Sequence, residues 1–286
     1  MLIFYKNLQT LCKKISYKLN TKSHEIKIEK YHNGEYIVKF KKSLINKKII
    51  LFFNLCKPIN INIIKCNFII NFIHQAQAKH ITLISPYIGY CRQDRPTDTN
   101  NNLIAAKLLA QLLETAGLNK IITIDIHSEQ IAGFYKIPLI NIKTTTIIKK
   151  LIQATHSKVI FPDTGSFNRF KNISSLTTHT LNKTRTNNKI TLNKTAIIKH
   201  NNVIIIDDIL DTGATLTATL KQIKSAHIYM YISHITNYNA QILKNNKIKK
   251  IFTTNTIQHT QYYKKLTQID ISKLIIKKIH HDKNIH

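Results

Sequence analysis

Short apolar runs rich in β-branched residues alternate along the chain with longer stretches in which apolar residues recur every three or four positions. Four such runs occupy residues 80–85, 120–125, 203–207 and 228–232. Each lies next to a stretch of helical periodicity, which is typical of β-α-β units whose parallel strands are covered by helices on both faces. The pattern predicts an α/β fold with mainly parallel sheets.

The clearest predicted helix spans residues 102–116. Five apolar residues recur at helical spacing along it: Leu103, Ala106, Leu109, Ala110 and Leu113. Gly117 follows them and is suited to end the helix, since glycine tolerates the left-handed backbone of a C-terminal cap. A second helix is expected near residues 61–79, directly before the run at 80–85.

The length of the chain, 286 residues, favours two domains over one, because single cores stop growing near about 250 residues. No Gly/Ser-rich or Pro-rich linker divides it. A strand-like segment at 137–142 gives way to a Thr-initiated helix at 144–155, so the junction is placed near Lys143. We expect domains at 1–142 and 143–286.

The charge balance raises the question of a nucleic-acid partner. Lys and Arg number 43 against 14 acidic residues, a net charge of +29. The lysines are scattered, however, without the interleaved aromatics and arginines of a single-strand binding platform. Abundant Ile, Lys and Asn also point to coding from an AT-rich genome. We therefore expect no nucleic acid as partner, and a field that attracts small polyanions.

The apolar runs and the cysteines indicate the cellular compartment in which the protein is found. No run approaches the roughly 18 apolar residues of a membrane-spanning helix, so no membrane partner is expected. The cysteines, Cys12, Cys56, Cys66 and Cys91, show neither the C-x-x-C spacing of a zinc ribbon nor a disulfide framework. The beginning of the chain lacks the features of a secretory signal. These observations predict a cytoplasmic protein.

The segment 203–215 carries the strongest chemical signal. A four-residue apolar strand is expected to end in two carboxylates, before a loop of small and hydroxylated residues opens a helix. The residues concerned are Asp207, Asp208, Asp211, Thr212, Gly213, Ala214 and Thr215. Backbone N–H groups and hydroxyls at the start of a helix can bind phosphate, and carboxylates at a strand end can bind sugar hydroxyls or a divalent cation. The competing interpretation is a capped turn with solvated acids.

Four other segments place polar residues beside predicted strands, at 31–35, 86–95, 125–134 and 161–165. Taken singly, each has an ordinary structural explanation. His127 can be a core histidine, the charges of 86–95 can be a solvated cluster, and 31–35 can be a plain turn. Asp163 follows a predicted strand, which places it with the carboxylates of the later segment.

Together these segments resemble the ribose-phosphate pyrophosphokinase family, also called phosphoribosyl-diphosphate synthetases. The stretch from Asp207 to Thr215 is similar to the family's ribose-phosphate loop, and 86–95 to its nucleotide segment. Residues 125–134 are similar to its metal-histidine segment and 161–165 to its P-D-x-G turn. The matches keep the family's order from about residue 28 to 258. The resemblance implies two similar phosphoribosyltransferase-type domains, each a mainly parallel sheet flanked by helices.

The resemblance also implies an activity: the diphosphoryl group of ATP passes to the anomeric hydroxyl of ribose 5-phosphate, giving 5-phosphoribosyl 1-diphosphate and AMP. It implies Mg²⁺ as cofactor, with His127 and Asp163 as metal ligands. The implied nucleotide-binding residues are Arg92, Gln93, Asp94, Tyr31, Asn33 and Glu35. The last three would reach the adenine bound by a neighbouring subunit, which makes the expected assembly a homo-oligomer.

The family further supplies two basic residues in a K-x-R pattern between the P-D-x-G turn and the carboxylate loop. Lys183 and Arg185 lie in this interval and are implied to stabilise the transition state by positive charge. Without the resemblance they would be ordinary exposed loop charges.

Some positions depart from the family pattern. Ser166 stands where a second glycine is expected after Gly165, Tyr31 replaces a phenylalanine, and the basic residues expected after Arg95 are missing. Three alternatives remain open: a catalytically weak or inactive regulatory relative, an ordinary phosphoribosyltransferase that consumes the activated sugar, and a nucleic-acid binder.

Overall fold

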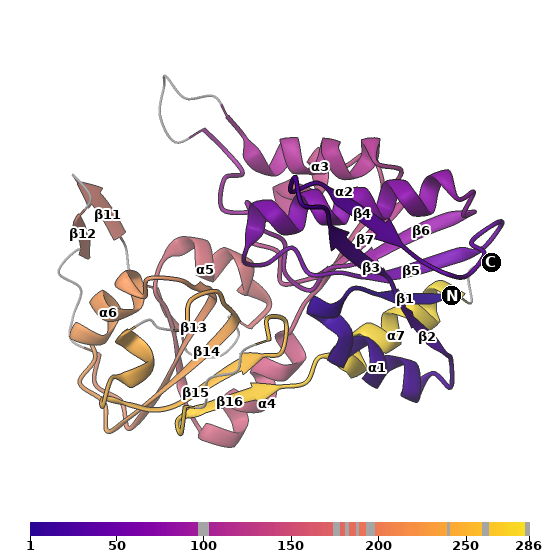
Figure 1. Ribbon diagram of the computed structural model, residues 1–286. Helices are drawn as coiled ribbons and strands as arrows, with labels where there is room; N and C mark the ends of the chain where they lie inside the picture. Colours follow the sequence, from indigo (N-terminus) through magenta and orange to yellow (C-terminus); the bar gives the residue numbers. More distant parts are fainter. Residues whose placement is uncertain are drawn as a thin grey trace. The chain divides into compact units, whose positions relative to one another are not determined.

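The computed structural model divides the chain into two compact units (Figure 1). The first comprises residues 1–142 and 271–286, and the second residues 143–270. The structure describes residues 1–96, 103–173, 178–180, 183–186, 189–192, 198–238, 241–258 and 263–283. For 178–180, 183–186, 189–192 and 281–283 the backbone alone is described. Each unit is built around a six-stranded parallel sheet.

The sheet of the first unit has the strand order β2-β1-β5-β6-β7-β8. Its strands are β1 Leu2–Phe4, β2 Ser23–Glu25, β5 Lys48–Phe52, β6 His80–Ile84, β7 Lys120–Ile124 and β8 Leu139–Ile142. Successive residues of a strand face opposite sides of the sheet, and both sides are buried: Leu51 belongs to one apolar core and Phe52 to the other. Such burial on both sides explains why central strands such as β5 and β6 are largely apolar runs.

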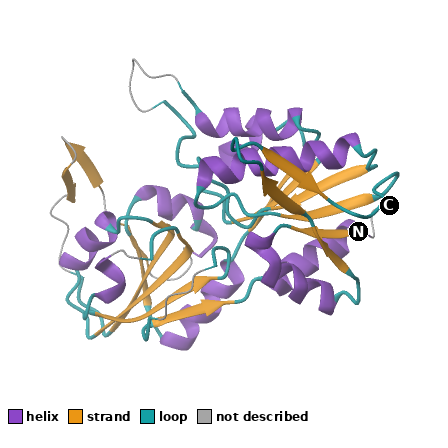
Figure 2. Cartoon of the chain, viewed as in Figure 1, coloured by secondary structure: helices purple, strands orange, loops and turns teal. Residues whose placement is uncertain are grey.

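Helices cover both faces of this sheet (Figure 2). The elements are η1 Lys6–Leu8, α1 Gln9–Lys18, α2 Ile59–Gln75, α3 Ala105–Thr115, η2 Glu129–Phe134 and α7 Ser272–Lys283. Helices α2 and α3 contribute to one core, and α1 and α7 to the other. Ile271, Ile275 and Ile279 recur at a spacing of four residues and bury against α1 and the sheet. The expected domain of residues 143–286 is therefore wrong at its end, because residues 271–286 belong to the first unit.

The first unit also contains a two-stranded antiparallel hairpin, β3 Lys27–Lys30 and β4 Tyr36–Lys39. These two strands form a sheet of their own and do not pair with the six-stranded sheet. Its turn contains Gly34, whose φ of +99° is a left-handed conformation that glycine adopts without strain. The Gly34 N–H donates to the Tyr31 carbonyl at 2.9 Å and closes the turn.

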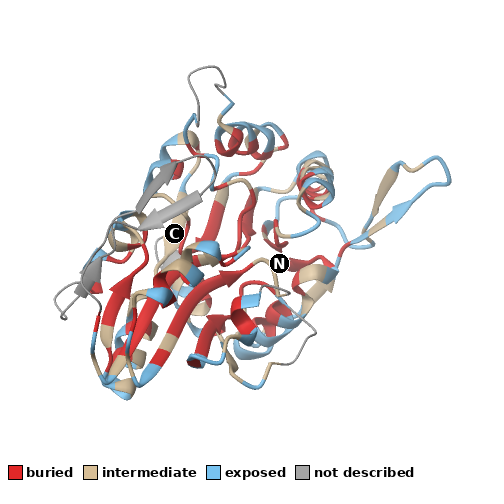
Figure 3. Cartoon of the chain, turned by 90° about the vertical axis from the view of Figure 1, so that its left-hand side faces the viewer, coloured by how far each residue is buried: buried red, intermediate tan, exposed pale blue. Residues whose placement is uncertain are grey.

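The sheet of the second unit has the order β10-β9-β13-β14-β15-β16. Its strands are β9 Lys158–Phe161, β10 Thr178–Thr180, β13 Asn202–Leu210, β14 His227–Ile235, β15 Ile248–Thr254 and β16 Leu266–Ile269. The remaining elements are α4 Thr145–Thr155, α5 Thr164–Arg169, η3 Lys171–Ile173, the ribbon of β11 Lys183–Thr186 and β12 Lys189–Leu192, α6 Ala214–Lys221 and η4 Gln241–Lys244. Strands β9, β13, β14 and β15 of this sheet are largely buried (Figure 3).

Two cores sandwich this second sheet as well. Val203 and Ile205 of β13 face the core that contains α6 and η4, whereas Ile204 and Ile206 face the core that contains α4 and η3. The predicted fold class, α/β with mainly parallel sheets flanked by helices, is confirmed. Within the described residues, none of the helices combines the length and the apolar character that a membrane crossing requires.

Candidate active site

The carboxylate pair of the second unit lies inside a strand. Strand β13 continues past Asp207 and Asp208 to Leu210, because Ile209 and Leu210 pair with the neighbouring strand β14. The prediction that the strand ends at the carboxylates is therefore wrong. The longer strand buries both acids, which retain 8% and 2% of their surface exposed.

The charges of this pair are met by an arginine from another element. Arg169, the last residue of α5, places Nη2 2.8 Å from Asp208 Oδ1 and 3.3 Å from Asp207 Oδ1. A guanidinium keeps its charge at any physiological pH and can serve two carboxylates at once. Arg169 thus links α5 to β13 at the acid pair.

The turn between β9 and α5 adds a third carboxylate. Asp163 is the N-cap of α5, and its Oδ1 accepts from the Ser166 N–H at 2.8 Å. The hydroxyl Oγ of Ser166, which is fully buried, lies 3.0 Å from Asp163 Oδ1 and 2.8 Å from Asp207 Oδ1. The P-D-x-G turn and the carboxylate pair, which the sequence suggested separately, are therefore joined by direct contacts.

Two carboxylates share the Arg169 guanidinium, and their burial side by side alters the pKa of Asp207. Burial is the largest cause and the Asp208 carboxylate the next; together they raise this pKa from 3.8 to about 7, against the opposing influence of Arg169. The cluster thus holds excess negative charge that a proton or a cation would relieve.

The segment from Asp211 to Thr215 leads from the end of β13 into the first turn of α6. Gly213 is the N-cap residue of α6 and has φ of +77°. A Cβ there would lie 2.9 Å from Cγ2 of Ile242, so both the backbone and the available space require glycine. Thr212 and Ala214 are exposed, and the N-terminus of an eight-residue helix follows. This arrangement suits a phosphate.

The two basic residues expected to stabilise the transition state fall on β11. Lys183 pairs with Leu192 and Arg185 with Ile190 of the antiparallel strand β12, which contacts α6. Lys183 and Arg185 occupy alternate positions of β11. Their side chains lie outside the described part of the chain, and their role stays a prediction.

In the first unit, the predicted nucleotide segment follows β6. Arg92 and Gln93 are exposed, while Asp94 is buried with Oδ1 4.0 Å from Nε of Arg95. The Gln93 N–H donates to the Tyr90 carbonyl, and the Gln93 carbonyl accepts from the N–H of Ala106 at the start of α3. The segment is thereby anchored to α3, with two side chains directed to solvent.

The other predicted nucleotide residues form the turn of the β3–β4 hairpin. Tyr31 is 53% exposed, and Asn33 Oδ1 accepts from the Glu35 N–H at 3.1 Å. The Tyr31 N–H donates to the Glu35 carbonyl at 2.8 Å. Tyr31, Asn33 and Glu35 are thus brought together in the turn of the hairpin, whereas Arg92 lies in the segment that follows β6 of the six-stranded sheet.

The predicted metal ligands belong to different units. His127 follows β7 in the first unit, and Asp163 follows β9 in the second. Among the residues that the structure describes, no group of three His, Cys, Asp or Glu side chains is arranged to hold a metal ion. The assignment of His127 and Asp163 as ligands remains a prediction.

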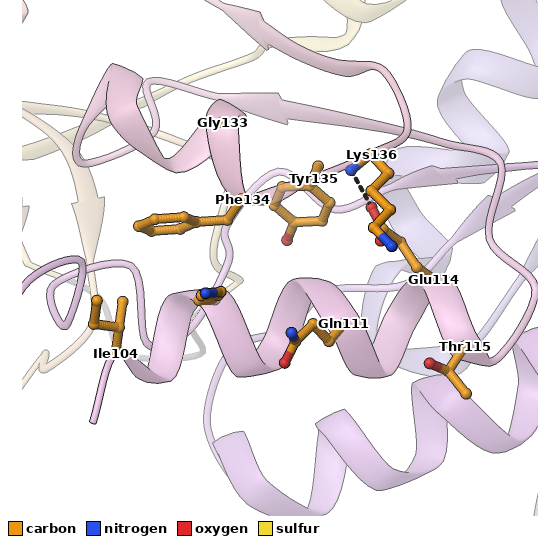
Figure 4. A pocket seen from close by; sticks show the side chains of 9 residues that line it. Ile104, Gln111, Glu114, Thr115, Gly133, Phe134, Tyr135 and Lys136 are labelled. Atoms are coloured by element: carbon orange, nitrogen blue, oxygen red, sulfur yellow. Dashed lines mark hydrogen bonds between the residues drawn. The ribbon is translucent and has the colours of Figure 1, made fainter. Parts of the chain in front are cut away.

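The first unit also contains a cavity of about 760 Å³ between α3 and η2 (Figure 4). Glu114 on its wall accepts from the backbone N–H of Lys136 at 2.5 Å. None of the residues predicted to bind nucleotide, ribose phosphate or metal lines this cavity. The cavity therefore lies apart from every predicted site residue.

Comparison with known proteins bears on both units. Residues 1–117 match the family model for the N-terminal domain of ribose phosphate pyrophosphokinase, and residues 103–265 match the phosphoribosyl transferase domain model. The ribose-phosphate pyrophosphokinase of Mycoplasma genitalium is 33% identical over 222 residues, covering 74% of this chain and 67% of that protein. The chain belongs to the ribose-phosphate pyrophosphokinase family. Its members are enzymes, as the resemblance implied.

Other relatives extend the match along the chain. The ribose-phosphate pyrophosphokinase of Mycoplasmopsis pulmonis is 29% identical over 282 residues, covering 94% of this chain and 88% of that protein. A solved phosphoribosylpyrophosphate synthetase from Mycobacterium smegmatis has the same fold, with a TM-score of 0.89, 23% identity and coverage of 100% and 99% of the two chains.

Sequence reasoning missed Arg169 of this ribose-phosphate pyrophosphokinase family member. A compositional signal was available, since four of the 43 basic residues are arginine. Arg92, Arg95 and Arg185 lie in or beside segments that the motifs had singled out, and Arg169 is the fourth. In a chain that otherwise uses lysine, the rarity of arginine distinguishes Arg169 from the other basic residues, because only arginine offers a planar, permanently charged group.

Proposed function

We propose that this member of the family transfers the diphosphoryl group of ATP to the anomeric hydroxyl of ribose 5-phosphate, releasing AMP and 5-phosphoribosyl 1-diphosphate. The observation that carries the proposal is the buried pair Asp207 and Asp208 on β13, held by Arg169 and followed directly by the loop to α6. Carboxylates suit the sugar hydroxyls, and the loop with its helix N-terminus suits the 5-phosphate.

Each part of this site has a proposed role. Asp211, Thr212, Gly213, Ala214 and Thr215 would surround the 5-phosphate with N–H groups and hydroxyls. Asp207 and Asp208 would accept from the ribose hydroxyls and fix the direction in which the anomeric oxygen points. Transfer of a phosphoryl group depends mainly on in-line alignment and on neutralising charge, so this orientation is itself the main catalytic contribution.

Positive charge on the ribbon β11–β12 would complete the reaction site. Lys183 and Arg185 lie on strand β11 of this ribbon, and β12 contacts the helix α6 that starts at the proposed phosphate loop. We propose that both neutralise the diphosphoryl group as its bond to AMP breaks. Fixed cations at developing charge are typically worth about 3 kcal/mol each.

We propose magnesium as the cofactor. The carboxylates of Asp163, Asp207 and Asp208 fit a divalent cation, which would offset the burial and the neighbouring Asp208 charge that raise the pKa of Asp207. Magnesium usually binds one or two carboxylates and takes its other ligands from water and substrate phosphates, which agrees with a cluster that is not arranged as a complete cage. Its contribution when bound would be to neutralise charge on the phosphoryl oxygens.

For the nucleotide, we propose Arg92, Gln93 and Asp94 as binding residues. The exposed Arg92 can contact phosphates or stack on the base, and the anchoring of this segment to α3 fixes the position of its backbone. His127 is proposed as a further ligand of the metal that accompanies ATP.

We also propose a homo-oligomer in which Tyr31, Asn33 and Glu35 reach the nucleotide of a neighbouring subunit. Helices α2 and α3 expose large apolar side chains at 42–47%: Ile61, Ile64, Phe68, Leu108 and Leu112. Apolar stripes of this kind usually mark an interface. Light scattering should find a smaller assembly for Phe68→Asp than for the unaltered protein; an unchanged mass would reject this face. We also propose that the enzyme is cytoplasmic, since its four cysteines, all of them within the described residues, form no disulfide.

The proposed reaction is tested by product analysis with a matched pair of lysine variants. Incubation with ATP, magnesium and ribose 5-phosphate should give AMP, and Lys183→Ala should lower turnover by about 100-fold. The control is Lys149→Ala, which alters an exposed lysine on α4 and should have no effect. Formation of ADP, or equal effects of the two variants, would contradict the proposal.

A further inference from the structure

The Ser166 hydroxyl occupies an unusual position in the carboxylate cluster. It is fully buried, and its Oγ is within hydrogen-bonding distance of two different carboxylates, Asp163 at 3.0 Å and Asp207 at 2.8 Å. Arg169 Nη2 donates to the same oxygen at 3.2 Å. A serine hydroxyl has one proton, so it can donate to one of the two carboxylates at a time.

The neighbouring donors indicate which carboxylate receives that proton. Asp163 Oδ1 already accepts from the Ser166 backbone N–H at 2.8 Å, as the N-cap of α5. The shorter Oγ contact is the one to Asp207 Oδ1. The hydroxyl is therefore best placed to donate its proton to Asp207, while a lone pair of its oxygen accepts from Arg169.

Asp207 is held asymmetrically as a result. Its Oδ1 accepts from Ser166 Oγ, from Arg169 Nη2 at 3.3 Å and from the Asp208 N–H at 3.0 Å. Among the residues that the structure describes, none donates to Oδ2 of Asp207. Three donors at one oxygen fix the plane of the carboxylate and leave the second oxygen to accept from a ligand.

We propose that Ser166 is a positioning residue for sugar binding, which orients Asp207 so that Oδ2 accepts a hydroxyl of ribose 5-phosphate. This inference rests on the proposed function. It assigns a role to the position at which the sequence departs from the glycine of the family pattern, because a glycine has no hydroxyl to supply. Removing the donor should weaken binding of the sugar phosphate and leave nucleotide binding unchanged.

The experiment measures binding and turnover separately in Ser166→Ala and Ser166→Cys. The alanine removes the donor, and the cysteine keeps the volume of the side chain but donates weakly. Calorimetric titration with ribose 5-phosphate should show a dissociation constant about 10-fold higher in both, as expected for a hydrogen bond to a charged group. The dissociation constant for ATP with magnesium should change less than two-fold.

Two controls separate positioning from loss of structure. Ser157→Ala removes a buried hydroxyl in the same unit, at the other end of β9, where Oγ donates to the Thr155 carbonyl at 3.5 Å. It should bind ribose 5-phosphate normally. In an Asp207→Asn background, Ser166→Ala should add less than a two-fold change, since its effect passes through that carboxylate.

Each outcome decides between the claims. If the unaltered protein binds ribose 5-phosphate but forms no AMP, the proposed reaction fails while the titrations still test Ser166. If the unaltered protein does not bind ribose 5-phosphate, both proposals are overturned. Equal weakening of ATP and sugar binding, unchanged sugar binding in both Ser166 variants, or full additivity with Asp207→Asn would overturn the role of Ser166 alone.

Discussion

Arg169 Nη2 lies 2.8 Å from Asp208 Oδ1, which brings a guanidinium from the short helix α5 against a carboxylate inside the strand β13. Both partners are largely buried, with side-chain exposures of 14% and 3%. An ion pair removed from water in this way is costly to form, and still more costly to break by removing one partner. The relationship makes Arg169 a structural requirement of the proposed ribose-phosphate site.

Replacing Arg169 should destabilise the protein strongly. Arg169→Ala leaves Asp207 and Asp208 buried without their cation, so we expect a loss of about 3 kcal/mol in the free energy of unfolding. The measurement is urea denaturation followed by circular dichroism. Arg95→Ala is the control, because that side chain is 81% exposed, and it should change stability by less than about 0.5 kcal/mol. Similar losses in both variants would contradict the assigned role.

Glycine at 213 should be irreplaceable, whereas glycine at 133 should not. Gly213→Ala combines a φ of +77° with a Cβ placed 2.9 Å from Ile242, and we expect a loss of about 1–3 kcal/mol. Gly133→Ala meets no atom within 4 Å and should be close to neutral. Thermal unfolding of the two variants gives the comparison, and equal melting temperatures would show that the loop tolerates a side chain.

The stability of the protein should depend on pH through Asp207. Its pKa is raised from 3.8 to about 7 in the folded chain, so the folded state binds this proton more tightly than the unfolded state. The stabilisation is fully present below about pH 4 and is lost as the pH rises through 7. From pH 5 to pH 8 the unaltered protein should therefore lose about 2 kcal/mol in its free energy of unfolding through this group. Asp207→Asn cannot titrate at this position and should not show that loss.

The control for this titration is Glu25→Gln, which alters an exposed carboxylate and should leave the pH profile unchanged. Unfolding experiments at pH 5, 6, 7 and 8 without magnesium give the profiles. A parallel profile for Asp207→Asn and the unaltered protein would mean that this carboxyl titrates normally.

The cysteines should be unreactive in the native protein. Burial raises the pKa of Cys12 to about 12 and of Cys56 to about 11, and burial also raises the pKa of Cys66. Because the thiolate is the reactive form, titration with a disulfide reagent at pH 8 should label less than one thiol in the native protein and four after denaturation. Rapid labelling of Cys12 or Cys66 without denaturant would contradict the packing of the first unit.

The sequence was sufficient for elements that follow from local patterns. The apolar runs at 80–85 and 228–232 are strands β6 and β14 in the structure, as predicted. A continuous apolar run between helices is removed from water only when both faces of the strand are covered. The predicted helix at 102–116 is α3, Ala105–Thr115, in the part that the structure describes. Contacts between segments far apart in the sequence could not be predicted in this way. Asp207 and Asp208 are polar and gave no indication that β13 continues to Leu210; the pairing of its last residues with β14 extends the strand.

The sequence was enough to predict the carboxylates of the candidate site, but it did not reveal the side chains that form hydrogen bonds and ion pairs with them. Ser166 was identified only as a departure from a family pattern, and its contacts with Asp163 and Asp207 depend on how α5 packs against β13. Likewise, the return of α7 to the first unit depends on the complementarity of its isoleucines with α1, which the spacing of Ile275 and Ile279 alone does not specify.

The most direct test of the whole account is ³¹P nuclear magnetic resonance of one reaction mixture containing the protein, ATP, magnesium and ribose 5-phosphate. We predict that AMP and a sugar carrying a diphosphate at its anomeric carbon appear together in equal amounts. ADP with a sugar bisphosphate, or an unchanged spectrum from correctly folded protein, would contradict the account.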